Sequence, residues 1–196
     1  GRQTTIKTRF VAGTQQMLRA DRETSRATAA GLQDQLAVDA EAAVRDHKVV
    51  VLSDYGKGVL ADATLARVIA AAAKAGATVI VDPKGSDYGR YRGAGILTPN
   101  LKELAAATGK PVDTDDAVIA AARGLVDGLG LTAVLVTRSR DGMTLVPAEG
   151  PVLHLAAEAQ EVFDVSGAGD TVVATLAACL AAGADLGRAA ALANLA

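Results

Sequence analysis

Residues 47–82 read HKVVVLSDYGKGVLADATLARVIAAAAKAGATVIVD, in which two short runs rich in valine and isoleucine flank a longer, alanine-rich segment. The two runs, 47–53 and 78–82, are mostly continuous in apolar residues rather than alternating, which is typical of strands buried on both faces. The segment between them, 60–75, is long enough for a helix and carries few polar residues. Because parallel strands need such a helical crossover, this stretch predicts a parallel strand pair within an α/β fold.

Strands and helices alternate through the rest of the chain in the same way. Hydrophobic residues make up 50% of the sequence and aromatic residues only 3%, so small side chains fill much of the interior and let helices lie close to a sheet. We therefore expect a mostly parallel sheet covered by helices on both faces. The further predicted elements are a helical stripe at 36–44, strands at 94–97 and 132–137, a β pair at 143–146 and 152–155, and helices at 101–108, 113–128 and 167–196 with a break near Gly183.

Residues 4–21 differ from this pattern, because they form two β-rich stretches joined near Gly13 and Thr14. The polar positions in both stretches are typical of a hairpin, and a two-stranded unit of this length buries little by itself. We interpret it as a flap on a larger body. The sequence begins in a β stretch and stops at Ala196 inside an apolar helix without a C-cap, so we expect parts of the fold to be missing on both sides.

Composition and charge argue against several classes of protein. The net charge is −2 with no basic stripe, which argues against a nucleic-acid partner. No apolar segment is long enough to span a membrane, and the N-terminal residues lack the apolar core of a signal peptide. The single cysteine, Cys179, is interpreted as a buried small hydrophobe; it excludes an internal disulfide, which fits a cytoplasmic location. His47 and His154 lack metal-ligand neighbours and are interpreted as structural.

The sequence FDVSGAGDT at 163–171 carries the strongest sign of chemistry, because a glycine turn leads directly into an apolar helix. Gly167 and Gly169 let successive backbone N–H groups turn outward at the helix N-terminus, where unpaired N–H groups and the helix dipole favour an anion. If that anion is a phosphoryl group in transfer, Asp170 beside it could accept the proton of the attacking hydroxyl. The alternative is a simple loop with Asp170 as the N-cap of the helix.

Two further polar segments follow predicted strands. In TPNLKE at 98–103, Asn100 and Glu103 have the spacing of a capping box, which is structural, but they also suit the surroundings of magnesium and phosphate oxygens. In VTRSRDG at 136–142, hydroxyls and a guanidinium could hold phosphates. The alternative for this segment is a polar turn in which Gly142 supplies the bend.

The segments DPKG at 82–85 and SDYGKG at 53–58 also follow strands. Because the carboxyl ends of parallel strands lie at one edge of a sheet, where open α/β folds bind ligands, we expect all of these loops to converge. The sequence contains neither GxxxxGK[ST] nor GxGxxG, so it supports neither a P-loop nor a dinucleotide fingerprint.

With these residues assembled, the sequence resembles the ribokinase-like (PfkB) family of carbohydrate kinases. DVSGAGDT is similar to the family's C-terminal signature DTxGAGD, with Ser166 where many members have Thr, and TPNLKE is similar to its N-x-x-E motif. Within the family the likeness is greatest to the heptose 7-phosphate kinase branch, to which DPKGSDYGRYRGA at 82–94 is particular. The resemblance implies a ribokinase-like three-layer α/β/α fold, with residues 1–24 as part of a small β lid and residues 25–196 as a partial core.

The resemblance also implies roles for residues in the matching motifs. Asp170 would be the catalytic base that deprotonates the anomeric hydroxyl of a sugar. The anion hole would consist of Gly167, Ala168 and Gly169. The residues that would contact ATP and its Mg²⁺ are Asn100, Leu101, Lys102 and Glu103, with Glu103 toward the metal. Further ATP contacts would come from Thr137, Arg138, Gly142, Lys84 and Asn194. The lid residues that would contact the sugar phosphate are Arg9 and Gln15, although Thr14 departs from the residue common in this branch.

The function implied by the resemblance is ATP-dependent phosphorylation of D-glycero-D-manno-heptose 7-phosphate at its anomeric hydroxyl. The product would be the 1,7-bisphosphate, used in ADP-heptose and lipopolysaccharide core synthesis. Family members commonly pair through their lid strands, and this branch is often fused to an adenylyltransferase, so a homodimer and a fused domain are implied partners. The alternatives are a kinase of another sugar, of the ribokinase or fructokinase type, and a non-catalytic nucleotide-binding fragment.

Overall fold

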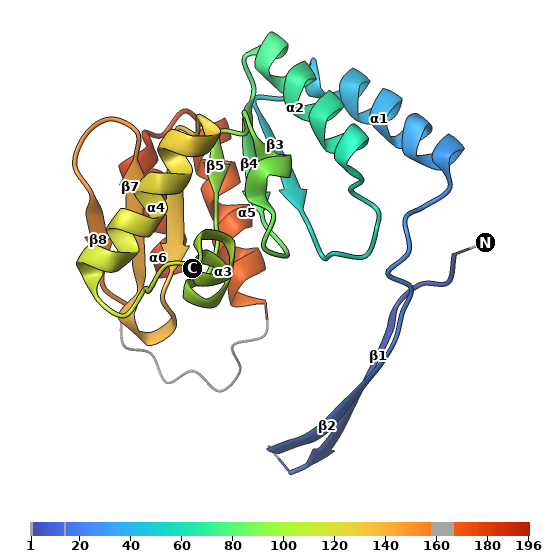
Figure 1. The fold of residues 1–196 in the computed structure, drawn as a ribbon, viewed down its shortest axis with the longest axis horizontal. Coiled ribbons are helices and arrows are strands. Elements are labelled where there is room, and N and C mark those ends of the chain that lie inside the picture. Colours follow the sequence, from blue (N-terminus) through green and yellow to red (C-terminus); the bar gives the residue numbers. More distant parts are fainter. Residues whose placement is uncertain (1, 14, 158–166) are drawn as a thin grey trace.

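The structure is a computed structural model that describes residues 2–13, 15–157 and 167–196. The described residues form a two-stranded hairpin and a six-stranded sheet of order β3-β4-β5-β6-β7-β8 (Figure 1). The strands of the sheet are β3 (Val49–Ser53), β4 (Thr78–Asp82), β5 (Ile96–Leu97), β6 (Ala133–Thr137), β7 (Met143–Pro147) and β8 (Leu153–Leu155). Strands β3 to β6 are parallel, while β7 and β8 run antiparallel to their neighbours. The prediction of a mostly parallel sheet is confirmed.

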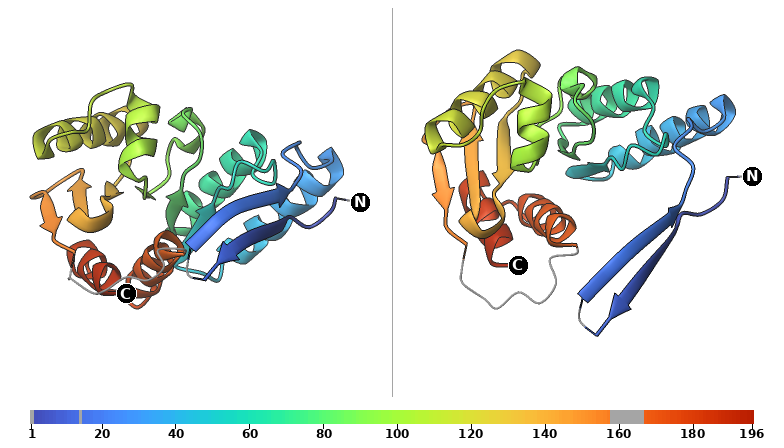
Figure 2. Two further views of the ribbon diagram at one scale, coloured as in Figure 1. Left: turned by 90° about the horizontal axis from the view of Figure 1, so that it is seen from below. Right: turned by 60° about the horizontal axis from the view of Figure 1, so that its bottom comes forward.

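Helices cover both faces of this sheet (Figures 1 and 2). Those on one face are α1 (Ala30–Val44), α2 (Asp62–Ala75), α3 (Leu101–Thr108) and α4 (Asp115–Leu129), and those on the other are α5 (Ala168–Ala181) and α6 (Leu186–Leu195). Strand side chains alternate between the two layers: Val79 and Val81 of β4 pack in the first core, and Ile80 packs in the second. The predicted three-layer α/β/α architecture is confirmed. Among the described residues, no helix has the length and hydropathy needed to cross a membrane.

Local sequence explains where several helices begin. Thr114 caps α4 by accepting a hydrogen bond from the backbone N–H of Ala117 at 3.2 Å, and Asp185 caps α6 by accepting one from Arg188 at 2.9 Å. The predicted break near Gly183 is confirmed as the interval between α5 and α6. Two single-turn 3₁₀ helices, η1 (Tyr88–Tyr91) and η2 (Ser139–Asp141), are not predicted, because so short an element has no apolar period to detect.

Strand β3 departs from the expectation of burial on both faces. Val51 is 41% exposed, although it lies in the middle of the apolar run. Within the described residues β3 pairs with β4 alone and stands at the edge of the sheet, so its outer side is open. An apolar run indicates a strand but does not give its position in the sheet.

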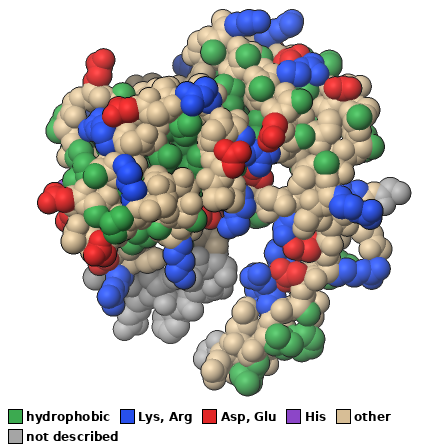
Figure 3. Space-filling model, viewed as in Figure 1, with side chains coloured by type: hydrophobic (Ala, Val, Ile, Leu, Met, Phe, Trp, Pro, Cys, Tyr) green, Lys and Arg blue, Asp and Glu red, His purple; other side chains and the backbone are tan. Residues whose placement is uncertain are grey.

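The hairpin predicted at 4–21 is confirmed as β1 (Ile6–Ala12) paired antiparallel with β2 (Gln15–Arg22). It extends away from the sheet (Figures 1 and 2), and every residue of both strands is exposed. Figure 3 shows hydrophobic side chains gathered on it, and the large ones are Ile6, Phe10, Val11, Met17 and Leu18. Thr14 lies outside the described residues.

The base of the hairpin is tied to the core by Arg2. Its guanidinium donates hydrogen bonds to three carbonyl oxygens, those of Thr24, Arg26 and Lys57. These contacts hold the start of the chain against the loop that follows β3. The division into a lid at 1–24 and a core at 25–196 stays a prediction.

Candidate active site

The loops that follow the parallel strands contact one another at one edge of the sheet. The loop after β4 meets α3, since Lys84 Nζ lies 3.0 Å from Glu103 Oε1. The loop after β5 meets the end of β6 through a parallel bridge between Asn100 and Thr137. The convergence of polar strand-end loops that the sequence predicts is therefore confirmed for these segments.

The first turn of α5 holds the residues predicted to bind an anion. Gly167 is the N-cap residue with φ +87°, and Ala168, Gly169 and Asp170 open the helix. Glycine adopts this left-handed backbone without strain, and the N–H groups of a first helical turn have no partner within the helix. Because Asp170 is the third residue of α5, the alternative in which it caps the helix is wrong. Residues 163–166 of the motif, Ser166 included, lie outside the described residues.

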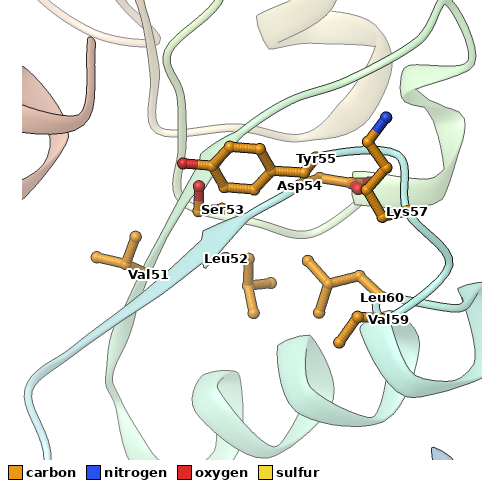
Figure 4. Close-up of a pocket in the computed structure, with 8 residues that line it drawn as sticks. All are labelled: Val51, Leu52, Ser53, Asp54, Tyr55, Lys57, Val59 and Leu60. Atoms are coloured by element: carbon orange, nitrogen blue, oxygen red, sulfur yellow. The ribbon is translucent and has the colours of Figure 1, made fainter. Parts of the chain in front are cut away.

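Asp170 contacts Tyr55, a residue that the sequence reasoning does not single out. Tyr55 Oη lies 3.2 Å from Oδ1 and 3.4 Å from Oδ2 of Asp170 and donates to this carboxylate. The negative charge of Asp170, with burial and the hydrogen bond adding to it, raises the pKa of Tyr55 above its ordinary value. Tyr55 and its neighbours line a cavity of about 350 Å³ beside the end of β3 (Figure 4).

Asp82, the last residue of β4, lies in the electric field of two other carboxylates. Burial raises the pKa of Asp82 to about 6, and the negative charges of Glu103 and Asp170 add to the shift, while Lys84 opposes it. A carboxylate whose charge is disfavoured in this way is stabilised by a nearby cation. The sheet edge thus combines a helix N-terminus that favours an anion with carboxylates that favour a cation.

Asn100 and Glu103 form the capping box that their spacing suggests. Asn100 Oδ1 accepts from the Glu103 N–H at 3.0 Å, and Glu103 Oε2 accepts from the Asn100 N–H at 3.1 Å. The structural role of this pair is confirmed, and it leaves Glu103 Oε1 facing Lys84. The two residues between them have no part in the capping box: Leu101 packs against the core, and Lys102 is exposed.

The carboxylates at this edge fit a nucleotide-bound magnesium rather than an all-protein metal cage. In the part of the chain that the structure describes, no three His, Cys, Asp or Glu side chains gather as metal ligands. Mg²⁺ commonly binds through one or two carboxylates together with phosphate and water oxygens. Glu103 and Asp82 supply carboxylates of that kind.

Arg138 follows β6 at the same edge, but its guanidinium is engaged within the protein. Nη2 lies 2.6 Å from Asp115 Oδ1, and Nη1 donates to Thr144 Oγ1 at 3.1 Å. Gly142, after η2, has φ +78°, and a Cβ atom there would lie 1.9 Å from the carbonyl oxygen of Leu155. Close packing is therefore one reason for this glycine, and its role along the triphosphate stays a prediction.

The other predicted contact residues lie on separate elements. Asn194 is on α6, and its Nδ2 donates to the carbonyl oxygen of Ala156 at 2.8 Å. Arg9 lies on β1 opposite Arg19, and Gln15 opens β2, so both belong to the hairpin that extends from the sheet. The structure does not bring Arg9 or Gln15 together with Asp170, and their contacts to a sugar phosphate stay predictions.

Both histidines have local partners, as expected for structural residues. His47 Nδ1 lies 2.7 Å from the Ala43 carbonyl oxygen, and His154 Nδ1 lies 3.2 Å from Thr144 Oγ1. Cys179 is partly buried and packs against the core under α5 and α6.

A buried network beneath the loop after β3 is the main feature that sequence reasoning missed. Asp54, 6% exposed, accepts hydrogen bonds from Tyr91 Oη at 2.7 Å, Arg90 Nη1 at 3.1 Å and the Gly56 N–H at 2.7 Å. The Arg90 guanidinium also lies 5.6 Å from the centroid of the Tyr91 ring. The signal available in the sequence is the run DPKGSDYGRYRGA, which supplies the two side-chain donors, Arg90 and Tyr91.

Comparison with known proteins gives the same assignment over the whole chain. Residues 1–196 match the family described as pfkB family carbohydrate kinase. "Bifunctional protein HldE" of Paramagnetospirillum magneticum is 61% identical over 196 residues, and that of Rhodospirillum rubrum is 57% identical over 195 residues. The matches cover 100% of this chain but 40% and 39% of those proteins, so the chain spans about 40% of the length of these curated relatives.

Solved structures share the fold. Arabidopsis thaliana ribokinase complexed with ribose and ATP has a TM-score of 0.72 and 25% identity, covering 90% of this chain and 57% of that one. Escherichia coli phosphofructokinase-2 in complex with substrates and products has a TM-score of 0.74 and 23% identity, covering 95% and 60%, and shows the fold alone. The predicted ribokinase-like fold is confirmed. Since the family match extends over every residue, the chain belongs to the pfkB family of carbohydrate kinases.

Proposed function

We propose that this chain is the kinase part of an enzyme that uses ATP to phosphorylate D-glycero-D-manno-heptose 7-phosphate. The phosphoryl group goes to the anomeric hydroxyl and gives the 1,7-bisphosphate for ADP-heptose and lipopolysaccharide core synthesis. The observation that carries the proposal is the position of Asp170 in the first turn of α5, beside the loops that follow the parallel strands. The choice of a heptose is supported by the run at 82–94 and by the 61% identity to a bifunctional HldE.

Asp170 acts as the general base in this proposal. Its carboxylate accepts the proton of the sugar hydroxyl as that oxygen attacks the terminal phosphorus of ATP. The backbone N–H groups of Gly167, Ala168 and Gly169 and the dipole of α5 stabilise negative charge on the transferred group. Phosphoryl transfer needs little covalent chemistry from the protein, so positioning and electrostatics supply most of the acceleration.

ATP binds along the loops after β5 and β6 in the same proposal, with contacts from Asn100, Leu101, Lys102, Thr137, Arg138, Gly142 and Asn194. Glu103 and Asp82 hold Mg²⁺, which neutralises charge on the phosphates when it is bound. Lys84 supports this arrangement because its side chain pairs with Glu103 and is 55% exposed, so it lies beside the proposed cation site and can turn toward a phosphate. The raised pKa of Asp82 supports a cation at this edge.

The hairpin acts as a lid in the proposal, with Arg9 and Gln15 contacting the sugar phosphate. Its strands also pair with those of a second copy to form a homodimer. Support comes from the cross-strand neighbours Phe10 and Leu18, which are 51% and 59% exposed and would bury apolar surface on pairing. The adenylyltransferase of the bifunctional protein would lie outside these 196 residues.

The test is a kinase assay with heptose 7-phosphate, ribose and fructose 6-phosphate as acceptors. We expect turnover to be highest with the heptose and to fall at least about 100-fold in Asp170→Asn, the scale of a lost general base. ATP affinity should stay within about three-fold, because the carboxylate acts on the acceptor rather than on the nucleotide. Asp127→Asn, on the exposed side of α4, is the matched control. An Asp170→Asn variant that keeps its activity on the heptose would show that the base is another residue.

Two other functions give different outcomes in this assay. A kinase of another sugar, which the likeness to ribokinase favours, would prefer ribose or fructose 6-phosphate over the heptose. A nucleotide-binding fragment would bind ATP and phosphorylate none of the three acceptors.

A further inference from the structure

The contact between Tyr55 and Asp170 joins two parts of the chain that are 115 residues apart. The hydroxyl of Tyr55 reaches both oxygens of the carboxylate, at 3.2 and 3.4 Å. A donor that lies between two carboxylate oxygens restrains rotation of the carboxylate about its bond to Cβ. The restraint matters here because Asp170 is exposed in a first helical turn and lies close enough to the carboxylate of Asp82 for their charges to interact.

The loop that carries Tyr55 is anchored from below. Asp54, the preceding residue, is held by donors from Tyr91, Arg90 and Gly56, and its own N–H donates to the Asp82 carbonyl at 2.9 Å. The side chain of Tyr55 itself is 56% exposed. Its backbone is therefore fixed by a buried network, while its ring contributes little to the hydrophobic core.

We propose that Tyr55 is a positioning residue that holds the carboxylate of Asp170 in its working orientation at the N-terminus of α5. The inference rests on the proposed function of Asp170 as the base. Tyr55 donates one hydrogen bond and transfers no proton in the reaction. Its hydroxyl orients the acceptor oxygen of the base toward the sugar hydroxyl, and misplacement of a reacting group lowers the rate steeply.

The contact can be tested without any enzymatic activity. The chain has three tyrosines, so NMR signals of their ring carbons can be followed during a pH titration, with Tyr55→Phe identifying the signal of Tyr55. Because the charge of Asp170 raises the pKa of Tyr55, Asp170→Asn should lower the pKa of Tyr55 toward its ordinary value. An unchanged titration of Tyr55 in Asp170→Asn would overturn the proposal.

The positioning role is tested by kinetics on heptose 7-phosphate. Tyr55→Phe should lower kcat by about ten-fold to a hundred-fold while KM for ATP changes by less than about two-fold. In an Asp170→Asn background, Tyr55→Phe should have no further effect, because a residue that acts through Asp170 has nothing left to position. Equal losses in both backgrounds would overturn the role, as would an unchanged kcat in the single variant.

Tyr88→Phe is the matched control, because this buried hydroxyl has no partner among the described residues. Its kcat should equal that of the wild type. A wild-type chain that phosphorylates no sugar would refute the proposed function, whereas the NMR titration would still decide whether Tyr55 holds Asp170.

Discussion

Removing the hydroxyl of Tyr91 should destabilise the protein, whereas removing the hydroxyl of its neighbour Tyr88 should not. Both side chains belong to η1, both are buried, and their rings pack edge to face with centroids 5.7 Å apart. Tyr91 Oη donates to the buried Asp54 at 2.7 Å and accepts from the Lys84 N–H at 3.2 Å. Tyr88 Oη has no hydrogen-bond partner in the described part of the chain. A change to Phe therefore removes the same atom from two similar sites with different bonding.

The magnitude follows from these contacts. A hydrogen bond to a charged group contributes about 1.5–3 kcal/mol, and Asp54 keeps the donors Arg90 and Gly56 after Tyr91→Phe. We therefore expect the free energy of unfolding to fall by about 2 kcal/mol, which lowers Tm by about 4–8 °C in a chain of this size. Tyr88→Phe removes a buried polar atom that has no partner among the described residues, so it should leave stability unchanged or raise it by up to about 1 kcal/mol.

Urea unfolding, monitored by circular dichroism, measures the stability of both variants. The midpoint should move for Tyr91→Phe with little change in the slope, since the variant exposes no additional surface on unfolding. Equal losses of stability in the two variants would refute the reasoning. They would show that the hydrogen bonds of the Tyr91 hydroxyl to the network around Asp54 add nothing to the free energy of unfolding.

Further predictions concern a packed glycine, a partly buried carboxyl group and the hairpin. Gly142→Ala should destabilise the protein by more than about 1 kcal/mol in thermal unfolding, because φ is +78° and the new Cβ would meet Leu155; Gly128→Ala, in an open part of α4, should be neutral or stabilising. Because the pKa of Asp82 is raised from 3.8 to about 6, the folded protein binds this proton more tightly than the unfolded chain. The free energy of unfolding should therefore fall as pH rises through that interval, by about 3 kcal/mol at most, and urea unfolding of Asp82→Asn across the same pH range should lack this slope. Phe10→Glu should shift the sedimentation of the chain toward the 19.7 kDa monomer, while Gln16→Glu adds the same charge without removing an apolar side chain and should not; a monomeric wild type would contradict pairing through the hairpin.

The elements of the fold could be predicted because their signals are local. Each signal consists of residues close together in the sequence, and each forms the predicted element. The examples are the apolar run of β4, the alanine-rich segment of α2 and the capping residues of α3. The position of β3 could not be predicted, because an edge strand and a central strand can have the same composition. Val51 is exposed because β3 stands at the edge of the described sheet.

In the candidate site, too, local features could be predicted from the sequence and long-range contacts could not. The start of α5 directly after its N-cap Gly167 and the pairing of Asn100 with Glu103 follow from motifs of a few residues. The contact of Tyr55 with Asp170 and the network around Asp54 join residues far apart in the chain, so they depend on the packing of the whole sheet edge. A single sequence predicts which loops meet at this edge but not which of their atoms are in contact.

Phosphorus NMR of the reaction products decides whether Asp170 is the base of a heptose kinase. With the protein, ATP, Mg²⁺ and heptose 7-phosphate, we expect a new signal from a phosphate on the anomeric carbon, growing in step with ADP. The signal should be absent over the same period with Asp170→Asn and present with Asp127→Asn. An anomeric phosphate formed equally fast by Asp170→Asn, or ADP formed without any phosphorylated sugar, would contradict the assignment.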